Sequence, residues 1–286
     1  MIDPYAPLVV ALTHSGFPMS RPLPRREWEP LLAPGPSFED VFERVRGLAD
    51  FDAVRTEIER LDTLGIWAAS WFSPSYPESL YRNLSAKAPP VVFGLGPLEA
   101  ASERAIGMVG SRDTPSTLLE LSRSVAAEAV QRGYGIVSGG ANGADLAALS
   151  AAGVAGGTTI AFAADRLAAV HRKLTQAGCN RDRTVVLTPY HPESGFTVGQ
   201  AMGRNKLIYA ASSATLVVHC DSGAGGTWSG AVEALKAGWV PVAVWTGEGK
   251  SEGNLALERL GAIGIKSSEE FFALAGKSFG QASLEL

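Results

Sequence analysis

Apolar runs that alternate with helix-like segments are the feature that most constrains how this chain can fold. The runs expected to form strands lie at residues 105–109, 135–138, 158–162, 184–188, 214–219 and 240–245. The segments expected to form helices lie at residues 116–131, 143–155, 203–211, 227–237 and 268–275. Such alternation is typical of a parallel sheet with helices on both faces. The sequence therefore predicts an α/β fold with a doubly wound, mostly parallel sheet.

The first part of the chain follows a different pattern. Residues 1–36 are rich in proline, residues 38–46 and 51–64 have helical periodicity, and residues 65–69 could form a short strand. Residues 76–80 and 88–93, which contain three prolines, are expected to form a linker into the sheet. A chain of 286 residues suits one large and one small unit. We expect a small, mainly helical region at residues 1–70 and the sheet domain at residues 71–286.

Composition excludes several classes of protein. The net charge is −4, so a binding site for a polyanion must be a local patch on an acidic body. The two cysteines have no metal-ligand spacing, and we expect neither a metal nor a cofactor. No secretory signal and no apolar run of membrane-spanning length is recognised, so the expected location is the cytoplasm, without a membrane segment.

Three turns rich in glycine or small residues follow expected strands. They are Gly110-Ser111-Arg112, the sequence SGGANGAD at residues 138–145, and SGAGGT at residues 222–227. Glycines allow a ligand to approach the backbone closely, and the following helices point their N-termini at the same place. Each turn alone could be a simple packing turn. Because open α/β sheets bind ligands at the carboxyl ends of their strands, the three together favour a phosphate-binding site.

Side chains in these turns suggest specific contacts. Arg112 offers a planar fork suited to phosphate. Asp145 could cap the following helix or hold the loop through backbone N–H groups, and Thr227 is a candidate helix cap. Two cations, Arg204 and Lys206, are expected at the start of the helix at 203–211, where they would oppose the helix dipole unless an anion offsets them.

Other residues are more ambiguous. Asn205, between those two cations, could bond to a base edge or to backbone. Arginines and a lysine between residues 166 and 183 form either a basic rim or a solvated loop.

Seven motifs occur in an order that resembles the DprA/Smf family of bacterial DNA-processing proteins. They are YPESL at 76–80, APP at 88–90, VGSR at 109–112, SGGANGAD at 138–145, RNKLI at 204–208, SGAGGT at 222–227, and GN at 253–254 with GA at 261–262. The resemblance covers roughly residues 65–265, and the order of the motifs rather than any single one carries it.

The resemblance implies a Rossmann-like sheet and a non-enzymatic protein that binds single-stranded DNA. It also implies a homodimer, a RecA-type recombinase as partner, and a role in DNA recombination, natural transformation or genome defence. Together with the turn geometry, it marks a set of candidate residues for binding DNA and phosphate. They are Gly110, Ser111, Arg112, Ser138, Gly139, Gly140, Asn142, Arg204, Asn205, Lys206, Ser222, Gly225, Gly226 and Thr227.

Departures from the family pattern leave alternatives open. Asn142 stands where the family usually has arginine, Leu149 where it often has histidine, and His219 where it often has an acidic residue. The altered pocket permits a sensor that binds a nucleotide signal. A nucleotide phosphoribohydrolase is disfavoured, because this chain has Gly230 where such an enzyme has its catalytic glutamate. The nearest carboxylate, Glu233, lies three residues further on.

Overall fold

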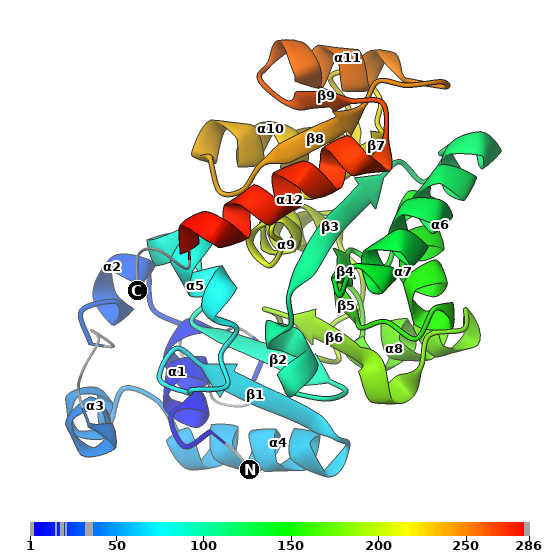
Figure 1. Cartoon of the computed structure of the whole chain (residues 1–286). Helices are drawn as coiled ribbons and strands as arrows, with labels where there is room; N and C mark the ends of the chain where they lie inside the picture. The colour runs from blue at the N-terminus through cyan, green and yellow to red at the C-terminus, as the bar shows by residue number, and fades with distance from the viewer. Residues whose placement is uncertain (1–2, 15, 18–19, 21, 32–36, 283–286) are drawn as a thin grey trace.

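The computed structural model describes residues 3–14, 16–17, 20, 22–31 and 37–282, and within them one 9-stranded sheet runs through the whole molecule (Figure 1). Its strands are β1 (Ile66–Ser70), β2 (Val91–Leu95), β3 (Ala105–Gly110), β4 (Gly135–Ser138), β5 (Thr159–Phe162), β6 (Thr184–Thr188), β7 (Thr215–His219), β8 (Val242–Trp245) and β9 (Ile263–Ile265). The predicted α/β class is confirmed.

Helices cover both faces of this sheet (Figure 1). They are α1 (Ala6–Thr13), α2 (Arg25–Trp28), α3 (Phe38–Val45), α4 (Phe51–Thr63), α5 (Glu78–Leu84), α6 (Ser116–Gln131), α7 (Ala144–Val154), α8 (Leu167–Gln176), α9 (Val198–Ala210), α10 (Gly225–Ala237), α11 (Glu252–Arg259) and α12 (Ser268–Ala282). Across the described part of the chain, none of them has the length and apolar character that crossing a bilayer requires.

The strand order is β1-β2-β6-β5-β4-β3-β7-β8-β9. The strands from β6 to β9 in this order are parallel, whereas β2 runs antiparallel to β6 and β1 antiparallel to β2. The chain builds outward from β3 in one direction through β4, β5 and β6, and in the other through β7, β8 and β9. The order therefore reverses between β3 and β7, which is where an open α/β sheet leaves a crevice for a ligand.

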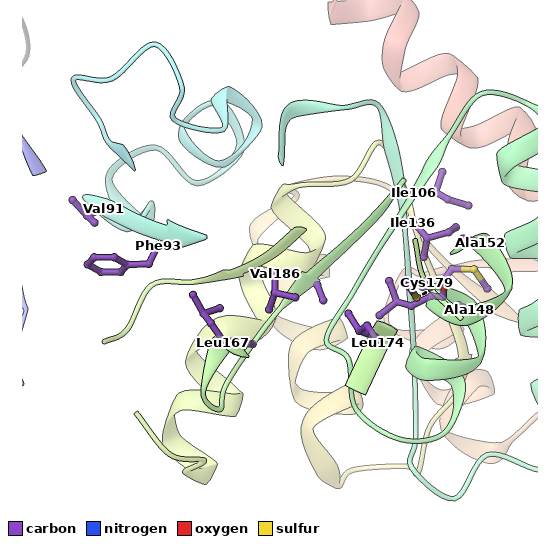
Figure 2. Close-up of a cluster of buried hydrophobic side chains, with 14 of the residues drawn as sticks. Val91, Phe93, Ile106, Ile136, Ala148, Ala152, Leu167, Leu174, Cys179 and Val186 are labelled. Carbon is purple, nitrogen blue, oxygen red and sulfur yellow. Dashed lines mark hydrogen bonds between the residues drawn. The ribbon is translucent and has the colours of Figure 1, made fainter. Parts of the chain in front are cut away.

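Alternation along the strands divides the core into two layers. In β3, Ile106 and Met108 face a layer formed with α1, α4, α6, α7, α8 and α12, whereas Ala105 and Val109 face a layer formed with α5, α9, α10 and α11. Figure 2 shows part of the first layer, where Ile136 of β4 lies near Ala148 and Ala152 of α7. Both faces are buried, which explains why the strands read as continuous apolar runs.

The N-terminal helices join the same core. Val10 of α1 and Ile58 of α4 belong to the buried layer that contains Ile106, and α4 packs on β1. The sequence did not predict helix α1 in the proline-rich segment. Pro7 lies in the first turn of this helix, where a backbone N–H group would have no partner within the helix, so the proline is tolerated. β1 is an edge strand of the large sheet, and the division of the chain at residue 70 stays a prediction.

The expectation of a linker at residues 76–80 and 88–93 is wrong. This part of the chain forms α5, a short 3₁₀ turn and the strand β2, which is hydrogen-bonded on both sides. Pro77 precedes the helix as its N-cap, and Pro90 precedes the strand, so both prolines stand at boundaries that tolerate them.

Candidate functional site

Two adjoining clefts open at the carboxyl ends of the parallel strands. The first, of about 400 Å³, lies at the reversal point between β3 and β7. The second, of about 360 Å³, lies beside the turn after β4, next to α8. Arg112, Ala141, Phe196 and Arg204 line both clefts, so these four residues form the boundary between them.

Most of the candidate residues gather in these clefts. Gly110, Ser111, Arg112, Arg204, Asn205, Gly225, Gly226 and Thr227 line the first cleft. Gly139, Gly140 and Asn142 line the second, together with Arg112 and Arg204. The three turns thus meet at one edge of the sheet, as expected from their positions after parallel strands.

Three candidates lie elsewhere. The Ser138 side chain is fully buried, and its hydroxyl donates to the carbonyl oxygen of Met108 inside the sheet. Lys206 extends away from the clefts and donates through Nζ to the Lys87 carbonyl oxygen at 3.0 Å. Ser222 is exposed and lines neither cleft.

Asp145 connects the first two turns through hydrogen bonds to their backbone. Its carboxylate accepts hydrogen bonds from the backbone N–H groups of Gly110 at 3.2 Å and Gly139 at 3.1 Å. Asp145 is the second residue of α7 and the N-cap is Gly143, so the loop-holding role is the one observed. These two N–H groups are therefore already used inside the protein and are not free to bind a phosphate.

Arg204 is the buried member of the boundary between the clefts and is only 7% exposed. Its Nη2 donates to the Gly139 carbonyl oxygen at 3.0 Å. Its Nε is buried and has no hydrogen-bond partner among the residues that the structure describes. Burial lowers the pKa of this guanidinium, and the nearby Asp145 raises it. An unpaired N–H donor on a buried cation is a feature that an anionic ligand would satisfy.

The expected helix start at residue 203 is wrong. Helix α9 begins at Val198, and the Thr197 hydroxyl caps it by accepting from the N–H group of Gln200. Arg204 and Lys206 therefore lie in the second and third turns of the helix rather than at its positive end, so the helix dipole does not disfavour them there. What points to an anion is the unpaired Nε of Arg204 instead.

The third turn presents an uncapped helix N-terminus to the first cleft. Helix α10 starts at Gly225, and its N-cap, Ala224, supplies no side-chain hydrogen bond. Thr227 is inside the helix and does not cap it, which corrects the expectation. Asn205 donates to the Gly226 carbonyl oxygen at 3.0 Å and so fixes the position of this turn. The first N–H groups of α10 are thus available to an anion in the cleft.

The boundary between the clefts also carries an exposed aromatic side chain. Phe196 is 49% exposed, and the guanidinium carbon of Arg112 lies 5.8 Å from the centre of its ring. Val198 and Met202, also exposed, extend this apolar wall along the first cleft. Sequence reasoning missed Phe196, because it comes from a loop without a recognisable motif.

One cation of the expected basic rim reaches the site. Lys173 of α8 lines the second cleft and donates through Nζ to the Gly140 carbonyl oxygen at 2.8 Å. Burial lowers the pKa of Lys173, as does the neighbouring Arg112. Residues 167–176 form a helix rather than a loop. The other four cations of the segment are exposed and line neither cleft: Arg166, Arg172, Arg181 and Arg183.

Tyr209 adds a further polar group to the floor of the first cleft. Its hydroxyl is buried without a hydrogen-bond partner in the described part of the molecule, and burial raises its pKa. Glu233 does not line the cleft, and Gly230 packs closely against Asn205 and Tyr209. The glutamate that a phosphoribohydrolase would need is absent from the lining of both described clefts.

Comparisons with known proteins agree with this geometry. The family model described as DNA recombination-mediator protein A matches residues 67–275. A Mycobacterium tuberculosis protein named as a DNA processing protein DprA is 32% identical over 152 residues, which cover 49% of this chain. The matched part is 37% of that relative's length.

Two solved structures share the fold. DNA processing protein A from Streptococcus pneumoniae has a TM-score of 0.67 and 24% identity, and the match covers 84% of this chain and 83% of that one. DNA processing protein A from Helicobacter pylori, whose structure is described for its single-stranded DNA binding mode, has a TM-score of 0.60 and 22% identity. That match covers 73% of this chain and 96% of the other, and both likenesses establish the Rossmann-like fold.

Proposed function

Because this chain belongs to the DNA recombination-mediator protein A family, we propose that it binds single-stranded DNA, without catalysis, in the two clefts at the carboxyl ends of its parallel strands. The observation that carries the proposal is the boundary between the clefts. There an exposed cation, Arg112, lies beside an exposed aromatic ring, Phe196, above the buried Arg204 with its unpaired Nε. A phosphate and a base could be held side by side at this point.

Phosphate binding would use three kinds of donor. Arg112 offers its exposed guanidinium, Arg204 its unpaired Nε, and α10 the N–H groups of its first turn. Asn142 and Lys173 in the second cleft would contact the next stretch of backbone. None of these groups reads sequence, so we expect binding that depends on salt and little on base identity.

Base binding would use the apolar wall. Phe196 is exposed on the face of the boundary, and Val198 and Met202 continue from it along α9. Stacking on an aromatic ring is tolerant of sequence because every base has a flat apolar face. DNA processing protein A from Helicobacter pylori, whose structure is described for its single-stranded DNA binding mode, supports the same ligand class here.

The proposal is tested by the fluorescence anisotropy of a labelled thymine oligonucleotide at two salt concentrations. We expect binding that weakens with salt, and Arg112→Ala should weaken it about tenfold and reduce the salt slope by about 0.7. The matched control is Arg123→Ala, because Arg123 is an exposed arginine on α6 that pairs with Glu120. Absence of binding at low salt, or equal affinities for the two variants, would contradict the proposal.

A nucleotide signal is the second candidate, because the first cleft has a volume of about 400 Å³, which is in the range of small-molecule sites. Displacement of the oligonucleotide by micromolar mononucleotide would favour this candidate.

The homodimer, the RecA-type recombinase as partner and the cytoplasmic location stay predictions from the family resemblance. Sedimentation of the purified protein tests the first of them.

A further inference from the structure

The loop between β6 and α9 carries Phe196 into the boundary between the clefts. We call residues 189–197 the site loop. Its first half is packed against the protein, with Pro192 buried, whereas residues 195–197 at its end are exposed. An exposed loop tip is normally mobile, and a mobile aromatic side chain must be ordered when a base stacks on it. The contacts that hold the first half of the loop therefore affect how well a base stacks on Phe196.

Helix α1 and the segment after it hold the start of the site loop. The Nε2 atom of His14 lies 3.0 Å from the carbonyl oxygen of Pro189 and donates a hydrogen bond to it. His14 is only 8% exposed, and burial lowers its pKa to about 4, so the ring is neutral at physiological pH. The ring of Phe17 lies 4.5 Å from the ring of His191 in the loop.

Helix α4 holds the middle of the site loop. The guanidinium of Arg60 bonds to the carboxylate of Glu57 at 2.7 Å and to that of Glu193 in the loop at 2.5 Å. His191 Nε2 lies 3.5 Å from the same Glu57 carboxylate. The side chains of Glu57, His191 and Glu193 are close enough together to hold a metal ion, but Arg60 already pairs with both carboxylates.

We propose that the N-terminal helices α1 and α4 position the site loop so that Phe196 is presented to a DNA base, with His14 and Arg60 as positioning residues. The inference rests on the proposed function and adds a role for the N-terminal region in it. Neither residue lines a cleft, so each acts through the loop rather than on the ligand. Holding the loop in place before binding reduces the entropy lost when a base stacks on Phe196.

The first test compares Arg60→Ala with Arg55→Ala. Both arginines are exposed on α4, but the ion pairs of Arg55 with described residues are all within its own helix, to Asp52 and Glu59. Arg60→Ala should weaken binding of the labelled thymine oligonucleotide about three- to fivefold, the range of one exposed ion pair, without changing the salt slope. Arg60→Lys should restore part of the loss. Equal affinities of Arg60→Ala and Arg55→Ala would overturn the inference.

A double-mutant cycle separates positioning from direct contact. In a Phe196→Ala background, Arg60→Ala should have no further effect on affinity, because the group that the loop presents is gone. If Arg60→Ala weakens binding equally in both backgrounds, Arg60 acts by itself and the inference is wrong. A reduced salt slope in Arg60→Ala would lead to the same conclusion, since it would mean direct contact with phosphate.

Hydrogen exchange without ligand tests the tether itself. Arg60→Ala should increase amide exchange at residues 189–199 relative to Arg55→Ala, and unchanged exchange there would overturn the inference. Failure of this inference can be distinguished from failure of the proposed function. If Arg112→Ala weakens DNA binding and Arg60→Ala does not, the DNA site is supported and the role of the N-terminal helices is refuted. If the unaltered protein does not bind DNA, both are refuted.

Discussion

The guanidinium of Arg204 packs directly against the Cα atom of Gly139, so a Cβ atom at that position would overlap Nη1. The same guanidinium donates to the Gly139 carbonyl oxygen at 3.0 Å. Position 139 therefore requires glycine, because any side chain there would occupy the space of the buried Arg204 guanidinium. The backbone N–H group of Gly139 donates to Asp145 rather than to a ligand.

We expect Gly139→Ala to displace Arg204 and weaken binding of single-stranded DNA at least tenfold, with a loss of about 1–3 kcal/mol in the free energy of unfolding. Gly199→Ala is the matched control, because Gly199 lies in α9 with open space around its Cα atom. That change should leave affinity unaltered and stabilise the helix by up to about 1 kcal/mol. Urea unfolding and oligonucleotide anisotropy measure both effects, and equal affinity of the two variants would contradict the packing argument.

Asn254 joins the ends of two strands behind the third turn. Its Nδ2 lies 3.3, 3.0 and 2.9 Å from the carbonyl oxygens of Val217, Val218 and Trp245, and its side chain is fully buried. The GN motif at residues 253–254 is thus structural, and Gly253 packs against the carbonyl group of Cys220.

Asn254→Asp should therefore destabilise the protein more than Asn254→Ala. Alanine removes the donors and leaves buried carbonyl groups unsatisfied, a cost of about 1–3 kcal/mol. Aspartate keeps the shape but brings a carboxylate oxygen against carbonyl oxygens, so it must repel them or become protonated. Urea unfolding at neutral pH gives the order, and an aspartate variant as stable as the alanine variant would refute this interpretation.

The sequence predicted the parallel strands and the three turns because local patterns determine them. The apolar runs of β3 to β8 are short and buried on both faces, and each glycine-rich turn follows directly from its strand. The sequence pattern predicts too late a start for α9, because Gly199 and Gly203 weaken the helical pattern before Arg204. The sequence does not predict β2, because its antiparallel pairing with β6 depends on contacts distant in the chain.

The side chains that complete the site could not be predicted in this way. Phe196, Tyr209 and Lys173 reach the clefts from a loop and two helices, and no local pattern distinguishes them from core or surface residues. Conversely, Lys206 matched a motif but points away, because it is two residues beyond Arg204 on α9 and so lies on another face of the helix. Motif spacing identified the turns, and only the packed structure shows which side chains face them.

Phe196 allows a prediction on the chemistry of the apolar wall. Phe196→Ala should weaken binding of the thymine oligonucleotide by about fivefold or more, since stacking contributes about 1–3 kcal/mol per base. Phe196→Trp should retain or increase affinity, because it keeps a flat ring beside Arg112. Val154→Ala, an exposed apolar residue at the end of α7, is the control and should leave affinity unchanged. A tryptophan variant as weak as the alanine variant would argue against stacking.

The buried ring of His14 should make the stability of the folded protein depend on pH. Burial lowers its pKa from 6.5 to about 4, and the nearby His191 lowers it further, against the raising effect of the hydrogen bond to Pro189. Between about pH 6.5 and pH 4 the unfolded chain binds a proton at this residue while the folded chain does not. Lowering the pH through this window therefore favours the unfolded state, by on the order of 3 kcal/mol in total.

Urea unfolding at pH 7, about 5.5 and about 4.5 measures this dependence, with His14→Gln as the variant. Glutamine does not titrate and retains an N–H donor for the Pro189 carbonyl oxygen. Carboxylates with lowered pKa values, such as Glu57 and Asp40, also lose stabilising interactions in acid, so the slopes of the two proteins are compared rather than their absolute stabilities. We expect a smaller loss of stability on acidification in His14→Gln, because only the protein with His14 gains a proton there on unfolding. Parallel curves for the two proteins would show that His14 is not buried as a neutral ring.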